Sequence, residues 1–180
     1  MRPPTVTIAT QRSHRLCNIV SARVKANSLS KDISQAPIGP PLVLDTNVAL
    51  DLLVFHDPAC QPLAVALEQG KWRWLSTSAM RAEFDDVVRR PAFERWAGRH
   101  ELFAAQWARW AVMVQPSPLV APARALRCAD PDDQMFIDLA LEFQPSLLLS
   151  RDLKLLCLAG PAAALGVRIG TPAQVVEPMK

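Results

Sequence analysis

The chain has 180 residues, half of them hydrophobic, which is enough to bury a substantial core in one domain with an extension. Its apolar stretches fall far short of the roughly 18 to 20 residues needed to span a bilayer, so a soluble, cytoplasmic protein with no membrane partner is expected. Residues 1–31 hold six of the 20 basic side chains and none of the 17 acidic ones, so the net charge of +3 comes from that segment and says nothing of nucleic-acid binding by the rest.

Residues 1–38 are predicted to be a basic, poorly ordered extension before a domain over residues 39–180, because a stretch rich in Pro and Gly separates the two. The Arg-rich composition of this extension, acid-free over residues 1–31, also fits an organellar transit peptide, or upstream sequence included by an early start codon. It contains no apolar run of the kind that secretory signals have.

In the first half of the domain, short apolar stretches alternate with segments of helical period. In chain order we expect a strand over 42–46, helices over 48–55 and 61–69, a strand over 71–75 and a helix over 79–90. Gly70 is a C-cap signal for the second helix, and Ser76, Thr77 and Ser78 offer N-cap hydroxyls to the third.

The second half is predicted as a helix over 92–114, a helix over 130–143, a strand over 147–150, a helix over 153–164 and short strands at 167–169 and 175–176. The segment over 92–114 carries aromatic side chains at helical spacings, namely Phe93, Trp96, Phe103, Trp107 and Trp110. We expect them to pack helices against the sheet, and the alternative is that they stack on nucleic-acid bases. The alternation predicts a three-layer α/β/α sandwich with a mostly parallel central sheet.

Two apolar runs end abruptly in polar side chains. Leu42-Val43-Leu44 is followed by Asp45-Thr46-Asn47, and Leu147-Leu148-Leu149 by Ser150-Arg151-Asp152. Both runs are expected to be buried strands, and α/β folds place their sites at the carboxyl ends of such strands. The sequence therefore predicts that Asp45 and Asp152 lie at one edge of the sheet, although Asp152 could equally cap the next helix.

Two helices supply further candidate acids. Glu83 lies at the edge of the apolar face of its helix, where a simple ion pair with Arg90 or Arg124 is the alternative explanation. Asp132 and Asp133 flank the buried stripe of the helix over 130–143, and there the alternative is that acids favour a helix start on electrostatic grounds alone.

A shared edge for these carboxylates would suit a hard divalent cation, which prefers oxygen ligands. Without the cation, close carboxylates repel one another and their pKa values rise. With Mg²⁺ or Mn²⁺ they stay ionised, and an anionic phosphodiester becomes the natural substrate.

Cysteine and histidine give no competing metal site, because His56 and His100 lack partners at a metal spacing. The cysteines are expected to be reduced and packed: Cys17, Cys60, Cys128 and Cys157.

These segments together resemble the PIN domain family over roughly residues 41–178, and more narrowly its branch of toxin components of toxin–antitoxin systems, the VapC-like ribonucleases. The resemblance rests on five segments: 42–47, 77–88, 130–143, 147–152 and the closing Thr171-Pro172. It implies Mg²⁺- or Mn²⁺-dependent cleavage of RNA that leaves a 3′-hydroxyl and a 5′-phosphate.

By this resemblance the four acids of the site are, in order, Asp45, Glu83, Asp133 and Asp152. Asp45, Asp133 and Asp152 would hold the cation, and Glu83 would orient or deprotonate the attacking water. The residues expected to support them are Thr46, Asn47, Asp130, Asp132 and Ser150. The chain departs from the family at Gln134, and at Arg151-Asp152-Leu153-Lys154 in place of the commoner Gly-Asp-Lys-Asp.

Four arginines either hold RNA phosphates or form surface ion pairs: Arg81, Arg89, Arg90 and Arg151. The resemblance also implies a cognate antitoxin and a homodimer formed through the aromatic helical segment.

Two other functions are considered. A PIN-like module that binds RNA or protein without cutting it stays open as an alternative. A phosphatase similar to the haloacid dehalogenases is less favoured, because that chemistry wants an acid where Asn47 stands.

Overall fold

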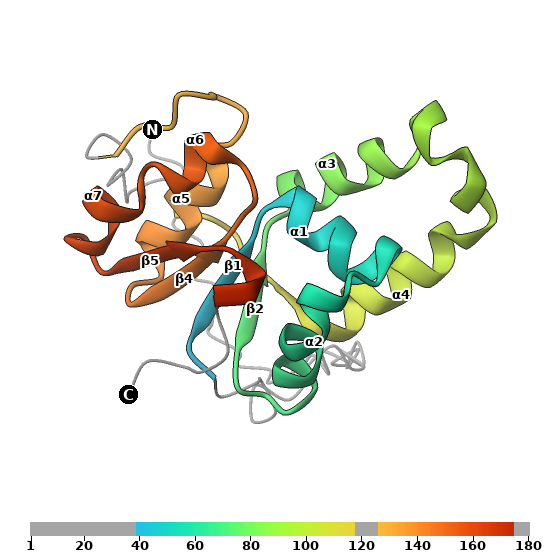
Figure 1. Cartoon of the computed structure of the whole chain (residues 1–180), viewed down its shortest axis with the longest axis horizontal. Coiled ribbons are helices and arrows are strands. Elements are labelled where there is room, and N and C mark those ends of the chain that lie inside the picture. The colour runs from blue at the N-terminus through green and yellow to red at the C-terminus, as the bar shows by residue number, and fades with distance from the viewer. Residues whose placement is uncertain (1–38, 118–125, 175–180) are drawn as a thin grey trace, which may run out of the picture. The chain divides into compact units, whose positions relative to one another are not determined.

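A parallel sheet of five short strands lies at the centre of the described residues (Figure 1). The structure is a computed structural model and describes residues 39–117 and 126–174. The strands are β1 (Pro41–Leu44), β2 (Arg73–Ser76), β3 (Ala111–Met113), β4 (Ser146–Leu149) and β5 (Val167–Gly170). Their order is β3-β2-β1-β4-β5 and every pairing is parallel, so their carboxyl ends meet at one edge.

Helices cover both faces of this sheet, which confirms the three-layer α/β/α prediction (Figure 1). One layer holds α1 (Thr46–Leu50), its π-helical continuation η2 (Asp51–Phe55), η3 (Pro58–Cys60), α2 (Gln61–Glu68), α3 (Ser78–Val88), η4 (Pro91–Arg99) and α4 (His100–Trp110). The other holds α5 (Gln134–Glu142), α6 (Leu153–Leu156) and α7 (Ala159–Ala163), and the short η6 (Pro172–Gln174) follows β5.

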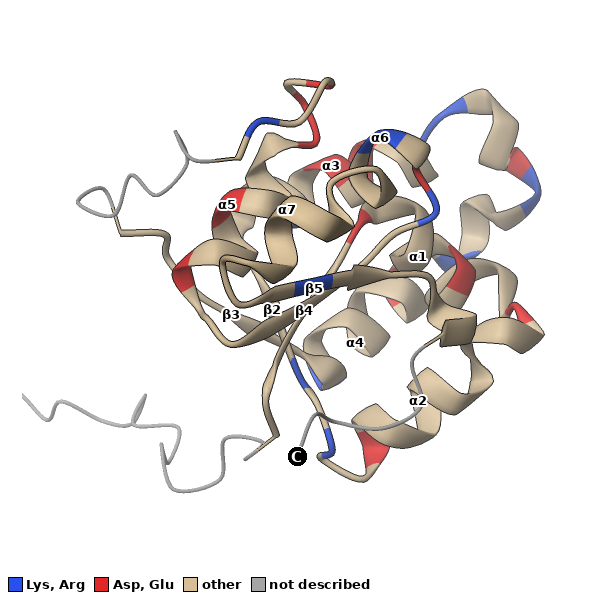
Figure 2. Cartoon of the chain, turned by 60° about the vertical axis from the view of Figure 1, so that its left-hand side comes forward, with Lys and Arg blue, Asp and Glu red and all other residues tan. Residues whose placement is uncertain are grey.

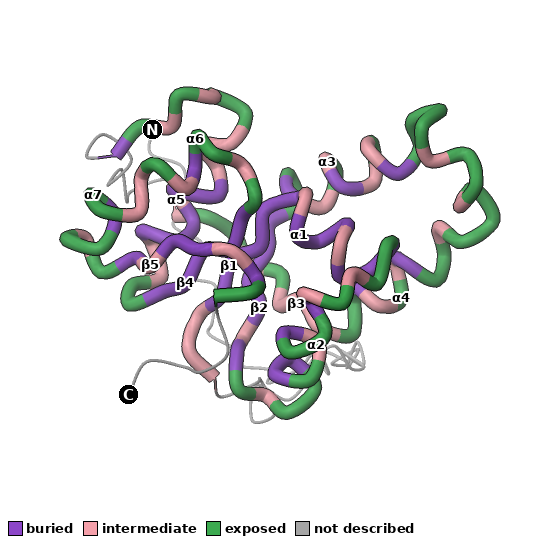
Figure 3. The backbone as a smooth tube through the Cα atoms, viewed as in Figure 1, coloured by how far each residue is buried: buried purple, intermediate pink, exposed green. Residues whose placement is uncertain are grey.

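Alternation along the strands divides the core into two clusters, one on each face of the sheet. In β1, Leu42 and Leu44 pack with the first helical layer, whereas Val43 packs with the second. Because both faces are covered, the inner strands are buried almost throughout (Figure 3). This is why they read in the sequence as continuous apolar runs.

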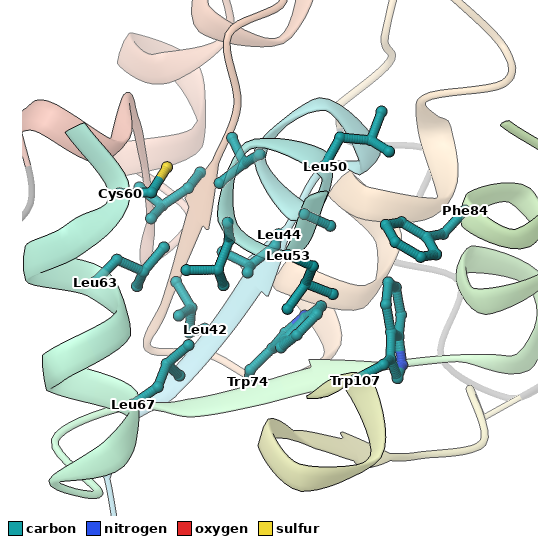
Figure 4. Close-up of a cluster of buried hydrophobic side chains, with 14 of the residues drawn as sticks. Leu42, Leu44, Leu50, Leu53, Cys60, Leu63, Leu67, Trp74, Phe84 and Trp107 are labelled. Carbon is teal, nitrogen blue, oxygen red and sulfur yellow. The ribbon is translucent and has the colours of Figure 1, made fainter. Parts of the chain in front are cut away.

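The aromatic side chains of the 92–114 segment pack into the first cluster, as expected. Phe103 and Trp107 are buried, and the Trp107 ring centroid lies 4.6 Å from that of Trp74 and 4.9 Å from that of Phe84 (Figure 4). The other three aromatic side chains of the segment are partly buried against the same cluster.

The boundaries of α2 and α3 follow the signals in the sequence. Gly70, at a φ of +64°, lies just beyond α2 in the left-handed region that favours glycine. Thr77 is the N-cap of α3, where its Oγ1 accepts a hydrogen bond from the Met80 amide at 3.3 Å.

Three predicted elements are corrected by the structure. The helix over 92–114 is wrong at its end, because Ala111–Met113 pairs with β2 as an edge strand too short to show a period. The helix over 130–143 begins later, at Gln134, since an aspartate before Pro131 favours an extended backbone. The helix over 153–164 is interrupted before Pro161, whose ring clashes with the carbonyl four residues earlier.

Some expectations fall on residues that the structure does not describe, namely the extension at 1–38, Cys17, Arg124 and the strand at 175–176. All the described cysteines are free thiols, as predicted. Cys60 is buried and Cys128 is partly buried, but Cys157 is exposed, so the prediction that the cysteines are packed is wrong for Cys157. In residues 39–117 and 126–174 no single helix is long and apolar enough to cross a membrane. The two consecutive segments Thr46–Phe55 and Pro58–Glu68 together reach that length and composition, but the chain bends by 105° between them.

Candidate metal centre

Asp45 follows β1 directly and is only 4 % exposed. Its Oδ2 accepts hydrogen bonds from Ser150 Oγ at 2.5 Å and from Asn47 Nδ2 at 2.6 Å. The strand register sets up the first of these, since Leu44 lies opposite Leu149. Burial raises the pKa of Asp45, and the bonds from Ser150 and Asn47 act against that rise.

Ser150 connects Asp45 to Asp152 across the edge of the sheet. Its fully buried hydroxyl donates to Asp45 and accepts the amide of Asp152 at 2.8 Å. Asp152 is the N-cap of α6, where its Oδ1 accepts the Lys154 amide at 2.6 Å. The capping alternative for Asp152 is therefore confirmed, and the cap uses one of its two carboxylate oxygens.

Glu83 reaches the same edge from α3. Burial raises its pKa, a hydrogen bond with Thr46 lowers it, and the negative charge of Asp45 raises it again. Its Oε2 is buried without a hydrogen-bond partner among the described residues. Arg90, one of the two partners that the ion-pair alternative named, donates instead to Asp86 at 2.9 Å. An unsatisfied buried carboxylate oxygen is costly, so this oxygen is suited to accept a hydrogen bond from a ligand at this edge.

Asp133 occupies the cap position of α5, but its side chain accepts no capping hydrogen bond. Its pKa is raised to about 6, first by burial and then by the charges of Asp45, Asp152, Asp130 and Glu83. Asp133 therefore does not cap α5 through a hydrogen bond, and the electrostatic explanation for an acid at this helix start stays open. The repulsion shows that these carboxylates, predicted from separate motifs, lie near one another.

Asp130 and Asp132 lie in the turn before α5. Asp130 Oδ1 accepts the Asp132 amide at 3.1 Å, and its Oδ2 pairs with Lys154 Nζ at 2.7 Å. The bond from Lys154 lowers the pKa of Asp130. This ion pair ties the turn to the first turn of α6, and its 24-residue separation explains why sequence reasoning missed it.

Gln134 secures the segment just before this turn. Its Oε1 accepts the Cys128 amide at 2.8 Å, and its Nε2 donates to the Leu126 carbonyl at 3.1 Å and to Asp138 Oδ1 at 2.7 Å. The departure from the family pattern at this position therefore has a structural role in the chain.

The chemistry of the donor set fits a hard divalent cation. The charges of Asp45, Asp152 and Glu83 raise the pKa of Asp133, the charge of Asp45 raises that of Glu83, and Glu83 has an oxygen without a donor among the described residues. Figure 2 shows acidic segments around the ends of α3 and α6. Within the described ranges, however, no three His, Cys, Asp or Glu side chains are already arranged around a common point.

Three of the four candidate arginines are paired with carboxylates. Arg81 makes two bonds of 2.9 Å to Asp85, Arg90 pairs with Asp86, and Arg151 pairs with Asp51 and Asp57. Arg89 makes no ion pair with any residue in the described ranges.

An open cleft of about 320 Å³ lies between the end of α3 and η4. Its lining includes Arg89, Arg90, Phe93 and His100, and none of the four candidate acids. His100 Nε2 lies 3.2 Å from a backbone carbonyl of α3, so this histidine has a structural contact.

Comparisons with known proteins agree with the fold and the motifs. The family profile described as the PIN domain matches residues 41–154. A chain in the crystal structure of VapBC2 from Rickettsia felis, bound to a DNA fragment from their promoter, aligns with a TM-score of 0.53 and 12 % identity, over 73 % of this chain and 98 % of that one. No protein with a curated description matches. Because the family match spans more than half of the sequence, this chain belongs to the PIN domain family, whose members are in general nucleases.

Proposed function

We propose that the protein is an Mg²⁺- or Mn²⁺-dependent endoribonuclease and the toxin component of a toxin–antitoxin pair, acting in the cytoplasm. One observation carries the nuclease part: Asp133 feels the charges of Asp45, Glu83 and Asp152 at the carboxyl edge of one parallel sheet. Membership of the PIN domain family supports it.

In this proposal Asp45, Asp133 and Asp152 hold the cation. A bound Mg²⁺ or Mn²⁺ neutralises these carboxylates and supplies a Lewis acid for phosphodiester hydrolysis, which leaves a 3′-hydroxyl and a 5′-phosphate in this family. Ser150 and Asn47 fix the position of Asp45 through their hydrogen bonds.

Glu83 orients or deprotonates the attacking water. Its hydrogen bond with Thr46 holds the side chain, and the unpartnered Oε2 is free to accept a proton. Its raised pKa makes it a better base than an ordinary glutamate near neutral pH.

Arg89 is the arginine best placed to hold an RNA phosphate, because it is exposed, makes no ion pair with described residues and lines an open cleft. Replacing Arg89 with Ala should weaken RNA binding and reduce the slope of log affinity against log salt by about 0.7, the value for one contact with a single strand. Fluorescence anisotropy at several salt concentrations measures both quantities, and an unchanged slope would remove Arg89 from the proposal.

The direct test of the activity is cleavage of an end-labelled RNA pool by the full chain with Mn²⁺, with Mg²⁺ and with EDTA. Wild type should cut only with metal, and Asp45→Asn and Asp133→Asn should not cut. Glu83→Gln should slow the reaction about 100- to 10,000-fold, the range for loss of a general base. Glu68→Gln, in an exposed ion pair with Arg109, is the matched control and should cut normally.

A catalytically silent module that binds RNA or protein is the alternative. The observation that favours it is the lack, among the described residues, of acids already arranged around a metal position. A folded wild type that binds RNA, fails to bind Mn²⁺ and leaves the RNA intact would establish this alternative and exclude the nuclease.

The toxin role implies a cognate antitoxin and, by family resemblance, a homodimer. The structural similarity to VapBC2 supports the antitoxin proposal. A short overlapping upstream reading frame that encodes a DNA-binding fold should be found, and its product should co-purify with this chain and inhibit cleavage. Absence of such a frame would favour a nuclease with another cellular role.

A further inference from the structure

The guanidinium of Arg151 is held between two carboxylates of the segment that follows α1. Its Nε pairs with Asp51 Oδ2 at 2.5 Å and its Nη2 with Asp57 Oδ2 at 2.9 Å. Arg151 lies between Ser150 and Asp152 in the loop from β4 to α6. These ion pairs therefore fix that loop against the start of η2 and the turn that follows η2.

The backbone of Arg151 extends the same network to Asp45. The Arg151 amide donates to Asn47 Oδ1 at 3.2 Å, and Asn47 Nδ2 donates to Asp45 Oδ2 at 2.6 Å. The two carboxylates are themselves fixed by the backbone, since the Asp57 amide donates to the Asp51 carbonyl at 2.9 Å. A continuous set of contacts thus joins Arg151 to the centre of the acidic edge.

The three side chains of this ion-pair network are partly buried, so loss of one partner would leave a charge poorly solvated. The side chains of Asp51, Asp57 and Arg151 are 15 %, 32 % and 42 % exposed. A partly buried carboxylate such as Asp51 needs a partner, and the planar fork of arginine can bridge two carboxylates where the point charge of lysine cannot. Arg151 thus directs its Nε and Nη2 toward protein carboxylates.

We propose that Arg151 is a positioning residue and not a phosphate contact: it locks the loop from β4 to α6 so that Asn47 and Asp152 are held beside Asp45. The assignment rests on the proposed function in one respect, because the site that it positions is the proposed metal centre. The prediction that Arg151 binds RNA phosphates is replaced by this role.

Asp57→Asn separates the two roles of Arg151. The asparagine keeps an oxygen to accept the Ala59 amide, which Asp57 Oδ1 accepts at 2.7 Å, but it removes one charge of the clamp. If Arg151 clamps the loop, Asp57→Asn and Arg151→Met should both weaken Mn²⁺ binding about 10- to 100-fold in calorimetric titration. Arg151→Lys should be intermediate. If Arg151 holds phosphate, Asp57→Asn frees it and leaves Mn²⁺ affinity unchanged.

Kinetics with the full chain give an independent criterion. For Arg151→Met and Asp57→Asn the kcat for RNA should fall while KM stays within about twofold. A raised KM with unchanged Mn²⁺ affinity in Arg151→Met would overturn the proposal. Arg109→Met is the control, because that arginine forms an exposed ion pair with Glu68 away from the loop.

Amide hydrogen exchange of the metal-free protein tests the clamp without reference to activity. The amides of Arg151 and Asp152 donate to Asn47 and Ser150, so both should exchange faster in Arg151→Met and Asp57→Asn while the amides of β4 stay protected. Unchanged exchange in both variants would overturn the clamp. A wild type that neither binds Mn²⁺ nor cuts RNA would overturn the proposed function alone.

Discussion

Asp133 makes the stability of the metal-free protein depend on pH. Folding raises its pKa from 3.8 to about 6, so between these values the native state binds a proton that the unfolded chain has lost. Stability contributed by this group is therefore lost as pH rises from about 4 to about 6. The raised pKa values of Asp45 and Glu83 act in the same direction.

The Asp133→Asn variant isolates this effect because its side chain stays neutral at every pH. In urea unfolding with EDTA, its gain in stability over wild type should grow from about pH 4 to about pH 6 and then level off. Saturating Mn²⁺ should reverse the order of the two proteins, since the cation stabilises only the ionised site. A gain that shrinks as pH rises would show that Asp133 is not repelled by its neighbours.

Trp107 packs the core beneath α4, yet its indole N–H is buried without a partner among the described residues. Trp107→Ala should lower the free energy of unfolding by about 3 to 5 kcal/mol, the usual result for a buried large aromatic. Trp107→Phe should cost much less, because it keeps most of the ring contacts with Trp74 and Phe84 and removes the unsatisfied donor. Chemical denaturation measures both, and equal losses would contradict this account of the packing.

At the level of elements, α6 begins with a carboxylate that has two roles. Asp152 caps the helix through the Lys154 amide and is proposed to hold the cation. Asp152→Asn should keep most of the cap and lose Mn²⁺ affinity, whereas Asp152→Ala should lose both and cost about 1 kcal/mol more in stability without metal. Thermal unfolding in EDTA and Mn²⁺ titration separate the two roles. Equal stability of the two variants would mean that the cap contributes nothing.

Elements with a strong local signal were predictable from the sequence. The strands β1 and β4 were found because both faces are covered and their apolar runs are unbroken, and α3 was found because Thr77 and Pro91 bound an amphipathic segment. The edge strand β3 was missed because three residues carry no period, and only its pairing with β2 defines it. The start of α5 was misplaced because an aspartate before proline can open a turn as well as a helix.

At the level of the whole molecule, the parallel topology brings the acids together, and that much followed from the sequence. Strand ends place Asp45 and Asp152 at one edge, α3 contributes Glu83, and the N-cap position of α5 contributes Asp133. The ion pairs that fix the surrounding loops did not follow, because they depend on tertiary packing. Arg151 and Asp57 lie 94 residues apart, and no local pattern marks them as partners.

The central claim is that these carboxylates form one metal centre, and calorimetric titration of the folded, full-length chain with Mn²⁺ tests it most directly. Wild type and the Glu68→Gln control should bind with the same affinity, and Asp45→Asn and Asp133→Asn should each lose binding. Binding that survives both substitutions, or a wild type that takes up no Mn²⁺, would contradict the account.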